Sequence, residues 1–247
     1  MGRIDGAVDH IKQLITEGRL RPGDKLPVEK ELADLLGVSR NSVREAVRTL
    51  TAIRVLQTRQ GDGTYVTSLR PELLLDTLNF VADLHQDATV LDFLAVRRLL
   101  EPEATALAAS RIEDADLAEL SRLLTEAEEY ADAAAVDHAG MVANDHAFHS
   151  RITRTSGNPV LAGVIANMSG ETLRARVWRG LTLDGVAHRT VAEHRAIYEA
   201  LADHDPDRAR LRAAVHVAGV EDWMRAAFAT GAPPDLPDEP RPWPDRD

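Results

Sequence analysis

The stretch SRNSVREAVRTL, residues 39–50, decides the fold of the first part of this chain. Its arginines Arg40, Arg44 and Arg48 recur at four-residue steps, so they share one face of a helix. Valine and leucine fill the opposite, apolar face, and Ser39 stands where a helix N-cap is expected. These residues predict a basic amphipathic helix that begins directly after Ser39.

A second amphipathic segment, EKELADLLG at residues 29–37, lies just before this helix and ends at Gly37. Two helices joined by a tight, glycine-containing turn, the second with basic residues at its start, are typical of the helix-turn-helix motif. In that motif the first turns of the second helix enter the major groove of DNA. A basic surface helix without such a role is the simpler alternative, and the segment that follows argues against it.

That segment is VLQTRQGDGTYV, residues 55–66, in which an Asp-Gly pair between two short β-prone runs predicts a hairpin. A phosphate-binding glycine loop would need a helix after GDGTYV, but a second strand-like run follows, so we reject a nucleotide site. A hairpin directly after a helix-turn-helix is a wing. With a first helix over residues 6–16, residues 1–69 are therefore predicted to form a winged helix-turn-helix domain that binds double-stranded DNA.

A resemblance to the GntR family of bacterial transcription regulators covers residues 4–67 and rests on LPVEKELADLLGVSRNSVREAVRTL followed by QGDGTYV. The resemblance implies six DNA-contacting residues, the last of them at the wing tip: Lys30, Ser39, Arg40, Asn41, Arg44 and Gly61. Lys30 stands where many members have arginine. Val55 stands where a glycine is usual between the recognition helix and the wing.

Composition limits the classes of protein that the chain can belong to. Its 247 residues include no cysteine, which excludes disulfides and thiolate metal sites and suits the cytoplasm. No apolar run approaches the length of a membrane span, and the N-terminus lacks an apolar signal segment. We therefore expect a cytoplasmic protein without a membrane partner.

The charge is divided unequally along the chain. Residues 1–67 hold 11 Lys and Arg against 9 Asp and Glu, a net of +2, whereas the remainder holds 18 against 31, a net of −13. DNA binding depends on the local field at the contact face and not on the total of −11. The division therefore predicts a DNA-binding head on an acidic body.

The body, residues 70–230, shows helical periods and almost no strand signal. Breaks are expected near Asp87, Asp114, Asp137, Asn158, Gly185 and Asp205. Short connections favour antiparallel neighbours. We predict a mainly α protein: the winged helix-turn-helix, then an all-α antiparallel bundle of six or seven helices for effector binding and dimerisation. Residues 231–247 hold six of the twelve prolines and are predicted to be a disordered tail.

Four residues of the body are candidate metal ligands. Asp145 and His149 are four residues apart and project from one helix face. His194 and His216 lie on apolar stripes that should face the interior. One Asp and three His suit a divalent first-row metal ion, with zinc expected first and nickel or manganese as alternatives. For each histidine alone, a hydrogen-bonded core position stays open as the alternative.

A second resemblance is to the FCD ligand-binding domain of the FadR-type GntR subfamily. It rests on RRLLEPEATALAAS at 97–110, DHAFHSRI at 145–152 and EHRAIYEAL at 193–201. Many members hold a metal ion with one Asp and three His, so the resemblance implies a metal site at Asp145, His149, His194 and His216. It also implies that Arg97 faces the effector, where a guanidinium can clamp a carboxylate through two hydrogen bonds.

Two pairs of residues with i, i+4 spacing are predicted to bind the effector: Arg97 with Glu101, and Arg174 with Trp178. The alternative for the first pair is a surface ion pair of little energetic consequence. The alternative for Trp178 is a core position.

A metal-dependent α-helical enzyme is the alternative function from another class. It would need a general base beside the metal, but Glu193, next to His194, is expected to point to a different face, and no HExxH motif occurs. We therefore predict a homodimeric transcription regulator that is not an enzyme. It is expected to be a repressor that binds a short inverted-repeat operator. A small carboxylate effector, such as a sugar acid or hydroxy acid, is predicted to control this binding from the metal site.

Overall fold

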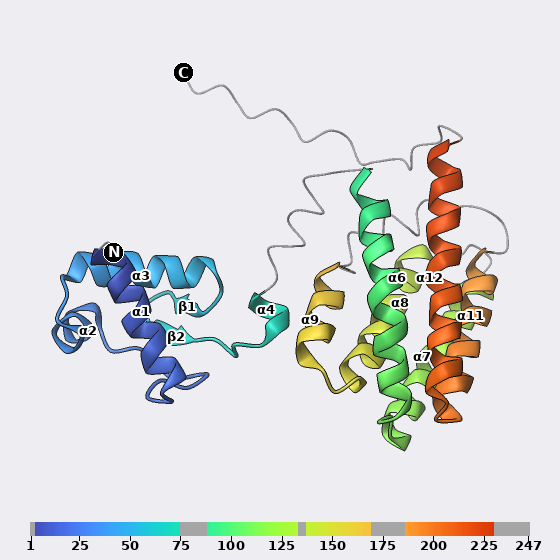
Figure 1. Ribbon diagram of the computed structural model, residues 1–247, viewed down its shortest axis with the longest axis horizontal. Coiled ribbons are helices and arrows are strands. Elements are labelled where there is room, and N and C mark those ends of the chain that lie inside the picture. The colour runs from blue at the N-terminus through green and yellow to red at the C-terminus, as the bar shows by residue number, and fades with distance from the viewer. Residues whose placement is uncertain (1–2, 75–87, 133–136, 169–185, 230–247) are drawn as a thin grey trace. The chain divides into compact units, whose positions relative to one another are not determined.

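The computed structural model describes residues 3–74, 88–132, 137–168 and 186–229, and their helices and strands are drawn in Figure 1. Contacts between backbone segments divide the chain into two units, Met1–Asp76 and Thr77–Asp247. Each unit is described by itself. The prediction of a mainly α chain with a small sheet near its start is confirmed.

The first unit is a three-helix domain with a β-hairpin. Its elements are α1 (Arg3–Thr16), α2 (Glu29–Leu36), α3 (Arg40–Ala52), β1 (Leu56–Arg59), β2 (Gly63–Val66) and the short α4 (Pro71–Leu74). β1 and β2 pair antiparallel, with Leu56 opposite Val66 and Arg59 opposite Gly63. Helices α2 and α3 form the helix-turn-helix, and the hairpin is the wing.

Local chemistry explains where the recognition helix begins. Ser39 has an extended backbone, and its Oγ accepts a hydrogen bond from the Ser42 amide at 3.1 Å, as an N-cap does. The preceding helix ends at Gly37, whose left-handed φ of 65° suits glycine. On the apolar face of α3, Val43 and Leu50 are fully buried together with Ile11 of α1.

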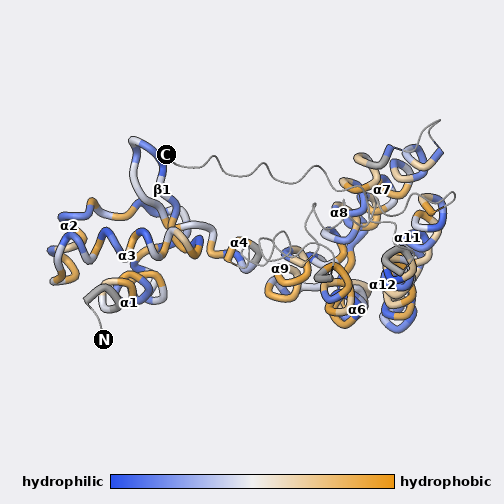
Figure 2. The backbone as a smooth tube through the Cα atoms, turned by 90° about the horizontal axis from the view of Figure 1, so that it is seen from above, coloured by the Kyte–Doolittle hydropathy of each residue, from blue (hydrophilic) through white to orange (hydrophobic). Residues whose placement is uncertain are grey.

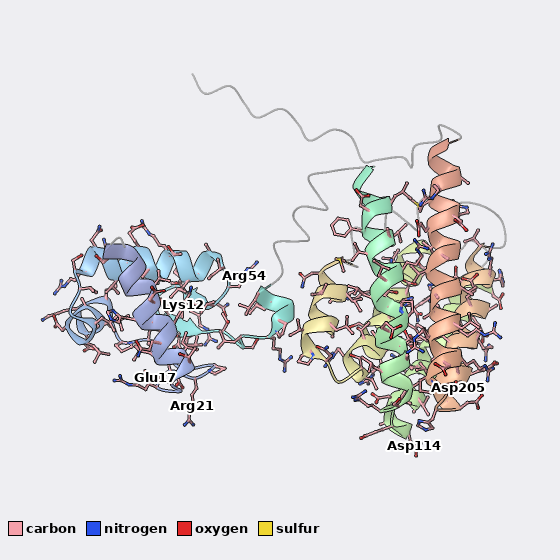
Figure 3. All side chains as sticks on the ribbon, viewed as in Figure 1. Lys12, Glu17, Arg21, Arg54, Asp114 and Asp205 are labelled. Carbon is pink, nitrogen blue, oxygen red and sulfur yellow. The ribbon has the colours of Figure 1, made fainter. Side chains whose placement is uncertain are left out.

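The connection between α3 and the wing differs from the prediction. The sequence comparison placed the unusual non-glycine residue at Val55, but the left-handed residue is Arg54, with a φ of 60°. Arg54 is labelled at the end of α3 in Figure 3. Val55 instead packs against the core of the first unit. The position that favours glycine is therefore one residue earlier, where the backbone leaves the helix.

The second unit is helical throughout its described part. Six helices lie in the described segments of residues 88–229: α6 (Ala88–Ala109), α7 (Asp114–Asp132), α8 (His138–Thr155), α9 (Pro159–Met168), α11 (Val186–Ala202) and α12 (Pro206–Ala229). Their starts fall within two residues of the predicted breaks. No helix of the described residues is long and apolar enough to cross a membrane. The predicted tail, residues 231–247, lies outside the described residues, and the boundary between residues 69 and 70 stays a prediction.

The helices of the second unit form two layers. Figures 1 and 2 agree that α9, α6 and α12 make one layer, with α8, α7 and α11 behind it. An apolar cluster that includes Phe148, Ile197 and Leu201 fills the space between helices, and the four predicted ligands lie on three of the same helices.

Candidate metal centre and nucleic-acid interface

The four predicted metal ligands come together in the second unit. α8 supplies Asp145 and His149, α11 supplies His194, and α12 supplies His216. Each is no more than 7% exposed, and each offers one ligand atom within 4.8 Å of the other three. The i, i+4 spacing on α8 and the inward stripes of α11 and α12 therefore converge on one point.

The spacing of these atoms fits a single small ion. Nε2 of His149 and Nε2 of His194 lie 3.6 Å and 3.4 Å from Oδ1 of Asp145. Ligands about 2.1 Å from one ion at tetrahedral angles stand about 3.4 Å apart. Nε2 of His149 is also buried without a hydrogen bond, and a metal ion would satisfy it. The donor set and its geometry are thus compatible with a divalent metal.

Burial prepares the histidines for this role. Desolvation lowers the pKa of His149 to about 4, against the opposing attraction of Glu101. Burial also lowers the pKa of His216. Metal ions bind neutral imidazole, so both rings are in the ligating state at neutral pH.

Two carboxylates that are not among the predicted ligands approach Nδ1 of two of the histidine rings. Nδ1 of His216 lies 2.9 Å from Oε2 of Glu193, which is a hydrogen bond. Nδ1 of His149 lies 3.5 Å from Oε2 of Glu101. Burial alone would raise the pKa of Glu193, but the hydrogen bonds from His216 and Arg189 outweigh it, so the pKa lies below its usual range.

The sequence predicted that Glu193 points to a different face from His194, but it did not predict the contact of Glu193 with His216. Glu193 does leave α11 in a different direction from His194, because adjacent helical residues point about 100° apart. α12 packs on that side, and it brings His216 to Glu193. The periodicity of one helix carries no information about which neighbour lies beside it. The sequence did contain one signal for Glu193: its i, i+4 spacing from Arg189 indicates an ion pair between the two residues on one face of α11.

Arg97 and Glu101 form a buried ion pair and not the surface pair considered as the alternative. Nε of Arg97 donates to Oε1 of Glu101 at 2.5 Å, and the two residues are 4% and 2% exposed. The pair adjoins His149 through Glu101. The other two predicted effector residues, Arg174 and Trp178, lie outside the described residues.

The predicted DNA contacts of the first unit are all exposed: Lys30, Ser39, Arg40, Asn41, Arg44 and Gly61. Sequence reasoning missed Glu29, whose carboxylate holds Arg44 in a two-pronged ion pair. Nε and Nη2 of Arg44 donate to Oε2 of Glu29 at 3.2 Å and 2.9 Å. The arginine side chain is therefore oriented in the free protein.

The wing tip is fixed to the body of the first unit. Asp62 accepts hydrogen bonds from Nζ of Lys25 at 3.1 Å and from the hydroxyl of Tyr65 at 2.7 Å. Gly63 has a φ of 143°, and a Cβ there would lie 2.6 Å from Cε of Lys25. The glycine thus allows the lysine to cross the hairpin and hold it.

Comparison with known proteins agrees with both units. The model of "Bacterial regulatory proteins, gntR family" matches residues 3–66, and the FCD domain model matches residues 92–219. The chain is 32% identical to the HTH-type transcriptional regulator LutR of Bacillus subtilis, over 87% of this chain and 98% of that protein. It is 29% identical to the galactonate operon transcriptional repressor of Escherichia coli, over 88% of this chain and 95% of that protein.

A solved structure of Streptococcus agalactiae GntR matches with a TM-score of 0.71 and 29% identity, and covers 89% of this chain and 99% of its own. The matched domains and relatives are those of transcription regulators, so the alternative of a metal-dependent enzyme is set aside. The chain belongs to the GntR family of bacterial transcription regulators, in the FadR-type group whose second domain is an FCD domain.

Proposed function

We propose that this regulator is a cytoplasmic homodimer that represses transcription, and that a small carboxylate effector at the metal centre controls its binding to an inverted-repeat operator. The buried cluster of one Asp and three His, in the same chain as the exposed basic face of α3, carries the proposal. The similarity to the galactonate operon transcriptional repressor supports the choice of repressor.

The recognition helix supports sequence-specific binding. Arg40 and Arg44 lie in the first turns of α3, where a helix that enters the major groove meets base edges. Lys30 and Gly61 are exposed on α2 and at the wing tip, which supports contacts of both residues with the phosphate backbone. A two-fold dimer carries two such heads and reads two half-sites, so the operator is an inverted repeat.

The ligand set supports zinc as the metal, with nickel and manganese as alternatives. One carboxylate oxygen and three imidazole nitrogens are ligands common to these ions. A divalent ion held by these four residues would take an oxygen ligand from the effector by expanding its coordination beyond four. Asp145 balances one of the two positive charges, and the Arg97–Glu101 pair is neutral, so one positive charge remains. That charge favours a singly charged effector, such as a hydroxy acid or sugar acid.

Arg97 supports a carboxylate effector in a second way. Its bonds to Glu101 use Nε and Nη2, so an effector carboxylate would bind through Nη1 or by exchange with Glu101. Glu101 also approaches His149, which connects the effector side of this pair to the metal ligands. A ligand held at both ends can favour one packing of α6 against α8 over another, and so change operator affinity.

The test is operator affinity with and without effector. A thermal-shift screen of small carboxylates on zinc-loaded protein identifies the effector, and a fragment from the gene's own upstream region serves as operator. Effector should weaken operator binding by about 5–150-fold. Removing Arg97 alone would take the arginine away from the buried carboxylate of Glu101, and breaking a buried ion pair in this way costs about 3–5 kcal/mol. The double variant Arg97→Ala/Glu101→Ala avoids this cost, and we expect it to bind operator and zinc but not to release on effector. A double variant that responds like wild type would place the effector clamp elsewhere.

A further inference from the structure

We propose that Glu193 is a positioning residue for the metal centre: its carboxylate fixes the tautomer and the ring orientation of His216, so that Nε2 of that ring is the ligand atom. This inference rests on the metal site of the proposed function. It adds a residue that lies outside the ligand set and belongs to a different helix from the histidine that it holds.

The hydrogen bond determines which ring nitrogen carries the proton. Oε2 of Glu193 lies 2.9 Å from Nδ1 of His216. An ionised carboxylate can only accept, so Nδ1 is the donor and Nε2 keeps its lone pair. His216 is 2% exposed, so water has little access to its ring. A histidine that ligates a metal commonly donates its other N–H to a carboxylate, which orients the ring and raises its basicity.

Glu193 is itself held in place. Its second oxygen, Oε1, accepts a hydrogen bond from Nε of Arg189 at 3.0 Å, one turn earlier on α11. Gly219 of α12 lies beside this pair: a Cβ there would be 3.3 Å from Nη2 of Arg189 and 3.8 Å from Oε1 of Glu193. The absence of a side chain at Gly219 therefore leaves room for the two hydrogen bonds that connect Arg189 to Glu193 and Glu193 to His216.

The other outer carboxylate is less suited to this task. Glu101 lies 3.5 Å from Nδ1 of His149, beyond a good hydrogen bond, and its oxygens already accept from Arg97. Of these two outer carboxylates, Glu193 has the shorter contact with a ligand ring. We therefore expect the strongest outer-sphere effect on metal affinity from Glu193.

The test compares zinc affinity in full-length variants, measured by competition with a chromogenic chelator. Glu193→Ala should bind zinc about 10–100-fold more weakly than wild type, the usual effect of losing such a partner. Glu193→Gln keeps an acceptor oxygen but not the charge, and should lose less than Glu193→Ala. Glu199→Ala is the matched control, because Glu199 lies on the same helix in an exposed ion pair with Arg208. It should bind zinc as wild type does.

The absorption spectrum of the cobalt-substituted protein separates positioning from a merely structural role. A turned His216 ring changes the ligand field, so the visible bands should shift in Glu193→Ala and be restored toward wild type in Glu193→Gln. If Glu193→Ala and Glu199→Ala share the wild-type affinity and spectrum, the proposal is overturned, even if Glu193→Ala unfolds more easily without metal. If wild type itself binds neither zinc nor cobalt, the metal site of the proposed function fails, and this inference fails with it.

Discussion

Arg44, which we propose contacts DNA, is held in one orientation by another residue of the same chain. Nε and Nη2 of Arg44 both donate hydrogen bonds to Glu29 of α2. This ion pair is exposed and therefore adds little to stability. Its value lies in orientation, because a guanidinium that is already held loses less freedom when it contacts a base. The carboxylate also repels phosphates, which disfavours non-specific binding.

We expect Arg40→Ala and Arg44→Ala each to cost about 1–3 kcal/mol at the operator. Glu29→Ala should have a different signature: non-specific affinity rises because a negative charge is lost, and the ratio of operator to non-specific affinity falls. Gel-shift titrations at fixed salt, on operator and on random DNA, measure both quantities. Arg122→Ala on α7 serves as the control for loss of an exposed arginine. Wild-type affinity in both Arg40→Ala and Arg44→Ala would remove α3 from the interface.

Arg54 carries backbone strain that glycine would not. Its φ of 60° is in the left-handed region, which costs a residue with a side chain about 1–2 kcal/mol. Arg54→Gly should therefore raise the local free energy of unfolding by about 0.5–1 kcal/mol, after the greater freedom of glycine in the unfolded chain is subtracted. Gly37→Ala, at a φ of 65°, should lower it. Amide exchange of the buried Leu50 reports on both variants, and equal exchange rates would show that neither turn is strained.

At the scale of elements, the proposed metal ligands connect α8 with the consecutive helices α11 and α12. Zinc at about 100 times its Kd should raise the free energy of unfolding by about 2.7 kcal/mol, and a chelator should reverse this. His194→Ala should largely abolish the effect. His188→Ala, on the same helix but in an exposed pair with Asp132, should keep it. Thermal unfolding with zinc and with chelator measures both, and a zinc response in His194→Ala equal to wild type would contradict the ligand set.

The metal-free protein should lose stability as the pH falls from about 6.5 to about 4. In this window His149 binds a proton in the unfolded chain but not in the folded one, where burial lowers its pKa to about 4. As the pH falls, the unfolded chain therefore binds a proton at His149 before the folded chain does. This difference lowers the free energy of unfolding by about 3 kcal/mol. Below about pH 4 His149 is protonated in both states, so its contribution to the loss ends. Urea unfolding across this range in wild type, His149→Gln and the control His188→Gln tests the assignment: only His149→Gln should flatten the curve.

The helices could be predicted from the sequence because their signals are local. The four-residue steps of α3 and the Asp145–His149 spacing need only one helix each. The contact between Glu193 and His216 depends on how α11 and α12 pack, and no periodicity within either helix determines that. The left-handed residue at Arg54 depends on where α3 ends, which a sequence pattern locates only to within a residue or so.

At the scale of the whole molecule, the second unit leaves an apolar surface on the solvent side of α6 and α12. Its large exposed residues are Val96, Leu99 and Leu107 of α6 with Leu211 and Val215 of α12. Near them the bond from Arg210 to Glu103 at 2.7 Å pairs two charges within the chain. An exposed apolar surface suits an identical surface on a second copy, as a two-fold interface requires. We propose this face as the dimer interface.

Placing charges on this face should separate the dimer. Leu99→Asp combined with Leu211→Asp buries like charges against each other across a two-fold interface and should give monomers by sedimentation. The monomers should bind an inverted repeat no better than one half-site. Val160→Asp, at an equally exposed position on α9, is the control and should remain dimeric. A dimeric Leu99→Asp/Leu211→Asp variant would locate the interface elsewhere.

The ribosome completes the DNA-binding unit well before it adds the last of the proposed metal ligands. The last residue of the wing, Val66, precedes the last ligand, His216, by 150 residues, which a ribosome adds in about 8–30 s. During that interval the winged unit can fold and meet DNA, while the centre that would regulate it is still incomplete. A chain that stopped before α12 would keep the recognition helix but lack His216, and so would be a regulator that no metal-dependent signal could release.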